Sequence, residues 1–229
     1  MSLVWKLTLE ELPGIGKKIN LLKTGKYPGI NKVVNNISDL NKSIIDKLPI
    51  ESQIALYHLT GDKYPREIIK YFETKYLPKI CVKLESNKCL IAGSYRRNAE
   101  FSSDIDLIAL VNDNYYIDYK KKLELLLKNG IKFINSGNIK SRFIIYIKKY
   151  RTWIPIDLVF VTENNYIPAL LHYTGSKNFN ISMSKQALIK GYKLSENGLF
   201  KNGKQIKVES EKEIFNILKR DYKEPEDRL

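Results

Sequence analysis

The spacing of apolar residues along the chain is helical at first and becomes strand-like later. From Leu7 to Phe72, apolar residues recur every three or four positions, in runs such as Ile37–Leu40, Ile44–Leu48 and Ile54–Leu59. This is the spacing of one face of a helix, and it predicts about four or five short helices. The proline in the segment Tyr64–Glu67 suits the first turn of a further helix.

The texture changes at Lys88, where short runs rich in β-branched and aromatic residues begin. Runs of this kind, bounded by polar and turn-forming residues, predict strands. A helical stretch at Tyr119–Leu127 interrupts them. The predicted strands are Cys89–Ala92, Asp106–Val111, Lys132–Ser136, Arg142–Lys148 and Ile154–Val161.

The remainder of the chain returns to a mixed pattern. We expect helices at Ile167–Tyr173 and Asn178–Lys190, then a small β region with a turn at Glu196–Gly198, and a last helix at Glu211–Leu218. The whole pattern predicts an α+β protein with three parts: a helical region over 1–85, a sheet domain over 86–165 and a small α+β region over 166–229.

The charge indicates the kind of partner. The 229 residues include 39 Lys plus Arg against 25 Asp plus Glu, which gives a formal net charge of +14. A surplus of this size favours a polyanionic partner, with nucleic acid as the leading candidate.

The chain contains few cysteines and histidines, which argues against two kinds of stabilising site. Cys81 and Cys89 are the only cysteines, and His58 and His172 are the only histidines. We therefore expect neither a disulfide framework nor a closed zinc site, and we expect a reducing, intracellular compartment. No run approaches the ~20 apolar residues of a membrane span, so we expect a soluble protein. The sequence does not indicate whether it acts in a nucleus or in the cytoplasm.

A Gly-Ser pair at the end of a predicted strand marks a candidate phosphate site. The segment Ile91–Arg97 has the sequence Ile-Ala-Gly-Ser-Tyr-Arg-Arg. A strand that ends in Gly-Ser and enters a helix offers backbone N–H groups and a hydroxyl to a phosphate. Gly93 would permit a close approach of the backbone, and Arg97 would add charge-assisted hydrogen bonds.

Three aspartates form the candidate catalytic group. Asp104 and Asp106 lie two positions apart in a run that continues as a strand, so both should face the same side. Asp157 interrupts the otherwise apolar run Ile154–Val161. If the two strands are neighbours, the three carboxylates form a site whose oxygen ligands favour Mg²⁺ or Mn²⁺ over zinc.

Such a site suits two-metal phosphoryl transfer, in which one ion lowers the pKa of an attacking hydroxyl and the other stabilises the triphosphate and its leaving group. The alternative is that Asp-x-Asp is an ordinary turn and that Asp157 is a charge on an edge strand. The combination with the upstream Gly-Ser favours the catalytic interpretation, and nucleotidyl transfer is the predicted reaction.

At these residues the chain resembles the X-family DNA polymerases. Further similarity lies in the segment Leu171–Ser176, which resembles the family's aromatic-aromatic-Thr-Gly-Ser segment, and in Tyr222–Arg228 at the carboxyl end. Tyr64–Glu67 resembles the helix that leads into the family's palm. The resemblance covers 36–229 and implies fingers over 1–85, a palm over 86–165 and a thumb over 166–229.

The resemblance also implies roles for particular residues. Asp104 and Asp106 would hold two Mg²⁺ ions, for which Mn²⁺ could substitute, and Asp157 would hold the ion that activates the primer 3′-hydroxyl. A cis peptide is implied at Gly175–Ser176. The implied nucleotide-binding residues are Gly93, Ser94, Arg97, Arg66, Ser102, Ser103, His172, Tyr173, Gly175 and Asn180.

The segment Leu12–Ile19 resembles the family's helix-hairpin-helix, whose glycine-rich turn presents backbone N–H groups to DNA phosphates. This implies DNA contacts by Gly14, Gly16, Lys17 and Lys18. The alternative is a plain turn between two helices. The family's amino-terminal lyase domain is shortened to this one hairpin, so we expect no lyase activity. Ser184 stands where the family often has an arginine, which favours low fidelity.

The sequence therefore predicts a monomeric DNA-directed DNA polymerase that adds dNTPs to the primer end in gapped DNA during base excision repair. Two alternatives remain open: a template-independent terminal nucleotidyltransferase, and a DNA-binding module that has lost activity.

Overall fold

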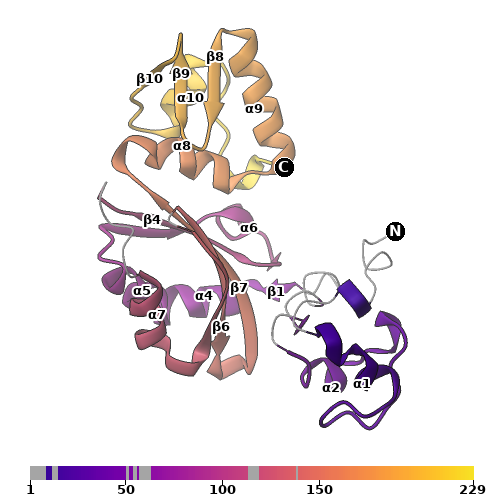
Figure 1. Ribbon diagram of the computed structural model, residues 1–229. Helices are drawn as coiled ribbons and strands as arrows, with labels where there is room; N and C mark the ends of the chain where they lie inside the picture. The colour runs from indigo at the N-terminus through magenta and orange to yellow at the C-terminus, as the bar shows by residue number, and fades with distance from the viewer. Residues whose placement is uncertain are drawn as a thin grey trace. The chain divides into compact units, whose positions relative to one another are not determined.

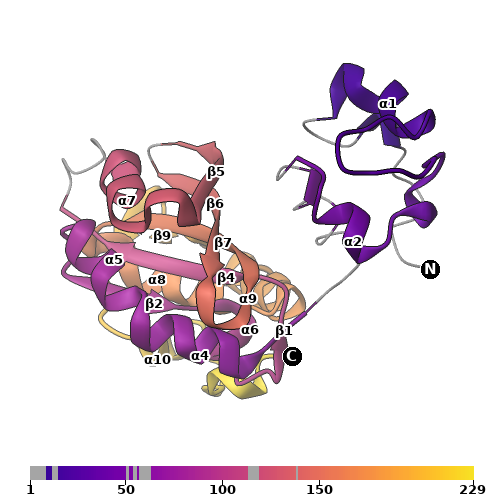
Figure 2. The same cartoon turned by 90° about the horizontal axis from the view of Figure 1, so that it is seen from below.

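The structure of the chain is a computed structural model, which describes residues 9–11, 15–49, 52–53, 56, 63–112, 119–137 and 139–229. The chain forms two compact units, Met1–Asp62 and Lys63–Leu229. Figures 1 and 2 show both units from two directions.

The first unit is built from short helical segments around its own apolar core. They are the 3₁₀ helices η2 (Leu9–Glu11), η3 (Gly16–Lys18) and η4 (Ile37–Asp39) and the α-helices α1 (Ile19–Lys23) and α2 (Lys42–Ile45). Leu22, Ile30 and Val34 lie at the centre of this core. Leu12, Pro13 and Gly14 of the predicted hairpin fall outside the described residues, and η3 begins at Gly16, so the hairpin stays a prediction.

The second unit contains a five-stranded mixed sheet with the order β2-β4-β7-β6-β5. Every neighbouring pair is antiparallel except β4 and β7, which run parallel. The short runs rich in β-branched and aromatic residues predicted each of these strands closely. Their bounds are β2 (Lys88–Ile91), β4 (Ile105–Leu110), β5 (Ile131–Ser136), β6 (Lys140–Ile147) and β7 (Thr152–Val161).

Helices cover the sheet unevenly (Figure 1). On one face, α4 (Arg66–Lys75), α5 (Leu77–Lys83) and α7 (Tyr119–Leu127) pack on the main core, where Phe72, Phe143 and Ile156 are fully buried. On the other face, α8 (Glu163–Thr174) packs against only the carboxyl-terminal halves of β4 and β7. The rest of that second face carries the candidate functional side chains. Two smaller elements complete this unit near the sheet. The short strand β1 (Tyr64–Pro65) pairs with β3 (Phe101–Ser102), and the helix α6 (Gly93–Arg96) follows β2.

A smaller subdomain follows α8 and has a separate core. It comprises α9 (Lys177–Ile189), the antiparallel strands β8 (Tyr192–Ser195), β9 (Gly198–Lys201) and β10 (Lys204–Ile206), α10 (Glu211–Ile217) and the 3₁₀ helix η7 (Pro225–Asp227). A buried ion network joins it to α6: Glu211 accepts hydrogen bonds from Arg96 at 2.6 Å and from Arg228 at 2.7 Å. Arg228 is fully buried, so its charge depends on this carboxylate.

The structure contains one disulfide, although the cysteine content predicted no disulfide framework. Cys81 on α5 and Cys89 on β2 form a disulfide, with their Cα atoms 5.8 Å apart. The chain reverses direction between α5 and β2, which brings together two residues eight positions apart. Cysteine use therefore gives no support to a reducing compartment. Among the described helices, none combines the length and apolar character that crossing a membrane requires.

Candidate active site

Three aspartates meet at the border between the covered and the uncovered part of the sheet. In the parallel pairing of β4 with β7, Asp106 is the direct partner of Asp157. Neighbouring residues at the same level of a sheet point to the same face, so their carboxylates project side by side. Asp104 precedes β4 by one residue and completes the group, because its charge acts on that of Asp106. The predicted adjacency of the two strands is confirmed.

The electrostatics of Asp106 show how concentrated the negative charge is. Burial raises the pKa of Asp106 to about 7, and the carboxylates of Asp104 and Asp157 add to the rise. The guanidinium groups of Arg97 and Arg142 act in the opposite direction. A buried carboxyl with two like charges beside it is a strong candidate for a functional site, since both conditions destabilise the fold.

Arg142 on β6 is a member of this site that the sequence patterns did not reveal. It is the cross-strand partner of Asp157 and donates from two guanidinium nitrogens to its two carboxylate oxygens. The available signal was weak: Arg142 is a charged residue within a predicted strand, and only the strand register puts it beside Asp157.

The donor chemistry of the three aspartates fits divalent magnesium or manganese. All ligands on offer are carboxylate oxygens, which hard cations prefer. Among the described residues, no three His, Cys, Asp or Glu side chains are arranged as a ready-made metal site. In the structure, Arg142 occupies both carboxylate oxygens of Asp157.

The Gly-Ser turn beside the carboxylates requires glycine. Gly93 has a φ of +57°, and a Cβ atom built on it would lie 1.9 Å from Oδ2 of Asp106. Any side chain would therefore displace the carboxylate. The turn leads into α6, as the sequence predicted, and brings Ser94 and Arg97 to the same place.

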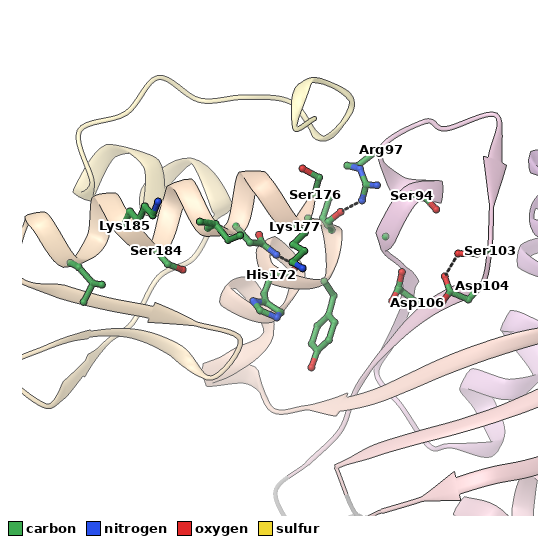
Figure 3. Close-up of a pocket in the computed structure, with 17 residues that line it drawn as sticks. Ser94, Arg97, Ser103, Asp104, Asp106, His172, Ser176, Lys177, Ser184 and Lys185 are labelled. Atoms are coloured by element: carbon green, nitrogen blue, oxygen red, sulfur yellow. Dashed lines mark hydrogen bonds between the residues drawn. The ribbon is translucent and has the colours of Figure 1, made fainter. Parts of the chain in front are cut away.

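A pocket of about 760 Å³ opens directly beside Asp104 and Asp106. Figure 3 shows Ser94, Arg97 and the two aspartates on one side of this pocket and His172, Lys177, Ser184 and Lys185 on the opposite side. Arg97 spans the two sides by donating to the carbonyl oxygen of Thr174. The lining residues are Gly93, Ser94, Arg97, Ser103, Asp104, Asp106, His172, Tyr173, Thr174, Gly175, Ser176, Lys177, Asn180, Ile181, Ser184, Lys185 and Leu188.

The comparisons with known proteins agree with this geometry. The DNA polymerase beta thumb family matches residues 169–229. The Repair DNA polymerase X of African swine fever virus, isolate Pig/Kenya/KEN-50/1950, is 27% identical over 154 residues, which cover 65% of this chain and 85% of the viral protein. The corresponding protein of the isolate Tick/South Africa/Pretoriuskop Pr4/1996 is 29% identical over the same number of residues.

A crystal structure of Leishmania infantum polymerase beta, titled as a ternary P/T complex, has the same fold. It superposes with a TM-score of 0.71 over 97% of both chains at 22% sequence identity. Together, these similarities support an X-family DNA polymerase.

The thumb side of this polymerase places several of the predicted nucleotide-binding residues in the pocket. The Gly175–Ser176 peptide is cis, as the family resemblance implied. Asn180 donates to the carbonyl oxygen of His172 at 2.7 Å, which ties the start of α9 to the end of α8. Burial lowers the pKa of His172, so its imidazole is neutral at pH 7.

Two predicted nucleotide-binding residues of the polymerase lie outside the pocket. Arg66 packs its guanidinium 4.1 Å from the ring centroid of Tyr95 and donates to the Tyr95 carbonyl oxygen at 2.6 Å. Ser102 is buried and accepts a hydrogen bond from Ser94 at 2.7 Å. Both residues support α6 in the structure. A role in nucleotide binding stays a prediction for each.

The predicted DNA contacts of the polymerase belong to the first unit. Gly16, Lys17 and Lys18 form η3, where both lysines are exposed, and Gly14 lies outside the described residues. The sequence did not single out Ile181 and Leu188, two exposed apolar residues of α9 that line the pocket. Their helical spacing relative to Ser184 was the only signal for them.

Proposed function

We propose that this polymerase adds dNTPs to the 3′-hydroxyl of a primer held in gapped DNA during repair. The observation that carries the proposal is the register pairing of Asp106 with Asp157 beside a pocket that contains Ser94 and Arg97. The family relatives support the repair role, since the viral polymerases are named as repair enzymes. The net charge of +14 suits a DNA partner.

The pocket offers distinct surfaces to the parts of a nucleotide. Ser94 and Arg97 would bind the triphosphate through a hydroxyl and a guanidinium, and Ser103 and Gly93 would border it. His172, Tyr173 and Gly175 would lie against the sugar, and Asn180 would reach the base edge. Asn180 is held for this role by its bond to the His172 carbonyl oxygen.

The aspartates would hold two Mg²⁺ ions, and Mn²⁺ would serve in their place. When bound, these ions lower the pKa of the attacking hydroxyl and neutralise charge on the triphosphate. Asp104 and Asp106 face the pocket and would serve the nucleotide side. Asp157 does not line the pocket and would face the primer end. Arg142 must release at least one oxygen of Asp157 for that role.

Primer extension on three substrates tests the proposal. The substrates are a one-nucleotide gap, an open primer-template and a single-stranded primer, each with Mg²⁺ and with Mn²⁺. We expect template-directed addition, most efficient at the gap. Addition to the single-stranded primer would instead support a terminal transferase. Binding of gapped DNA without addition on any substrate would support an inactive DNA-binding module.

A further inference from the structure

The end of the active-site face that lies beyond α8 carries an aromatic and basic patch that the nucleotide pocket does not use. Three successive cross-strand pairs of β6 and β7 share this face: Arg142 with Asp157, Ile144 with Pro155, and Tyr146 with Trp153. Because side chains alternate between faces, all six residues point to the side of the carboxylates. The last pair lies next to the turn between the two strands.

The contacts of Trp153 show that the patch is built from three strands. The rings of Tyr146 and Trp153 lie 5.3 Å apart between centroids. Lys132, from β5, places its ammonium group 5.7 Å from the centroid of the Trp153 ring. Lys132 is exposed and the two aromatic residues are half-buried, so all three can contact a ligand. We call Lys132, Tyr146 and Trp153 the Trp153 patch.

Positive charge continues from the patch to the end of the hairpin. Lys148 and Arg151 flank the turn that joins β6 to β7, and both are exposed. Aromatic faces next to a row of basic groups are the combination that binds a nucleic-acid backbone and its sugars or bases.

The position of the patch relative to the pocket selects the strand that it would contact. The pocket lies on the α8 and α9 side of the carboxylates, whereas the patch lies toward the amino-terminal end of β7. Figure 1 shows this end of β6 and β7 away from α8 and α9. A primer whose 3′ end reaches Asp157 must approach from the side that the nucleotide does not occupy.

The spacing agrees with this direction. Trp153 precedes Asp157 by four residues, which is ~13 Å along a strand at ~3.3 Å per residue. Phosphates of one DNA strand follow each other every ~3.4 Å along the duplex axis, so the patch reaches about four nucleotides back from the 3′ end.

We propose that the Trp153 patch binds the primer strand behind its 3′ end, with the aromatic faces against the sugars and Lys132 against a phosphate. This inference rests on the proposed function, since it assigns the primer strand of that reaction to a surface. The patch would hold the primer end in register with Asp157 and would raise affinity for DNA without contacting the incoming nucleotide.

Trp153→Ala and Lys132→Ala test the inference in the full chain. We expect each to weaken binding of a gapped primer-template by about tenfold and to raise KM for DNA, with KM for the dNTP unchanged. Lys132→Ala should also make DNA binding less sensitive to salt: the negative slope of the logarithm of the binding constant against the logarithm of the salt concentration should decrease in size by about 0.9. Lys121→Ala, an exposed lysine of α7 on the opposite face, is the matched control and should change neither quantity.

Two further measurements separate a ligand contact from a structural role and the primer from the template. The Tyr146–Trp153 pair also stabilises the hairpin, so Trp153→Phe should keep the thermal stability of the parent and most of its DNA affinity. The second measurement replaces one phosphate, two to five nucleotides from the primer 3′ end, with a neutral methylphosphonate. The loss of DNA-binding free energy from this change and the loss from Lys132→Ala should not add, because both remove the same contact. The same replacement in the template strand should give losses that add.

The outcomes distinguish the two proposals. Normal DNA affinity and salt slope in both patch variants of an active polymerase would overturn the assignment of this surface. Non-additivity with the template phosphates alone would overturn the choice of strand. Absence of primer extension by the unmodified chain would overturn the proposed function, whatever the patch variants bind.

Discussion

Arg142 holds both carboxylate oxygens of Asp157 from the neighbouring strand. The pair is partly exposed, with 46% and 33% of the two side chains accessible, so it contributes little to stability. Its effect is on the charge of the site, because the guanidinium partly neutralises the three aspartates. A divalent cation held by the aspartates, as proposed, would therefore compete with Arg142 for Asp157.

This competition predicts that Arg142→Ala binds divalent cations more tightly. Removing one positive charge a few ångströms from the site should be worth roughly 1 kcal/mol, or about fivefold in affinity. Titration of the DNA-free protein with Mn²⁺, followed by electron paramagnetic resonance, measures this directly. Arg220→Ala removes a positive charge from the thumb and is the control. Equal Mn²⁺ affinity in Arg142→Ala and the parent would show that the ion pair does not compete.

The pKa of Asp106 predicts a specific dependence of stability on pH. It lies at about 7 in the folded protein because of burial and the neighbouring carboxylates, against ~4 in an unfolded chain. Between these values the folded chain keeps a proton that the unfolded chain has lost. The free energy of unfolding should therefore fall as pH rises from about 4 to 7, and the loss should remain at higher pH.

Asp106→Asn removes this titration. We expect the variant to exceed the parent in free energy of unfolding by on the order of 2 kcal/mol at pH 8 and by less at pH 5. Urea unfolding at both pH values, with a chelator present, measures the difference. Asp221→Asn makes the same chemical change at an exposed position away from the site. A gain that is the same at both pH values would contradict the account.

Gly93→Ala should disable catalysis by moving a carboxylate. The added Cβ would lie 1.9 Å from Oδ2 of Asp106, which must shift. A displacement of about 1 Å at reacting groups costs on the order of 100-fold in rate, so we expect a loss of at least that size in kcat. Gly130→Ala is the control, because its Cβ would meet nothing within 4 Å. Near-normal extension by Gly93→Ala would mean that Asp106 tolerates the shift.

Ser184→Arg tests the hypothesis of low fidelity. Ser184 lines the pocket on α9, where a short hydroxyl cannot reach as far as an arginine. A charged hydrogen bond to a correctly paired base should improve discrimination by about tenfold or more. The ratio of kcat/KM for correct and incorrect dNTPs measures it. Ser182→Arg, on the same helix outside the pocket lining, is the control. Strong discrimination by the unmodified polymerase would remove the hypothesis.

The sequence predicted the five-stranded sheet well because its strands are runs rich in β-branched and aromatic residues. The run Ile154–Val161 is apolar apart from Asp157; the run predicted the strand, and the exception indicated the candidate catalytic residue. The joining of Asp157 to Asp104 and Asp106 followed from chemistry, since the like charges of these aspartates are best tolerated around a shared cation.

Features that depend on strand register or on where the chain reverses direction could not be predicted from the sequence. The pairing of Arg142 with Asp157 requires knowing how β6 aligns with β7. The Cys81–Cys89 disulfide depends on how tightly the chain reverses between α5 and β2. Arg66 was predicted to bind nucleotide from family resemblance alone, and its cation–π contact with Tyr95 is a tertiary contact that no local pattern encodes.

Asp157→Ala in paired assays of extension and binding tests the central claim most directly. The account predicts a loss of at least about 10³-fold in dNTP addition at a one-nucleotide gap. Affinity for the same gapped DNA should stay within about twofold, because the DNA contacts lie on basic and aromatic groups. Extension by Asp157→Ala at a rate close to that of the parent would contradict the three-aspartate site.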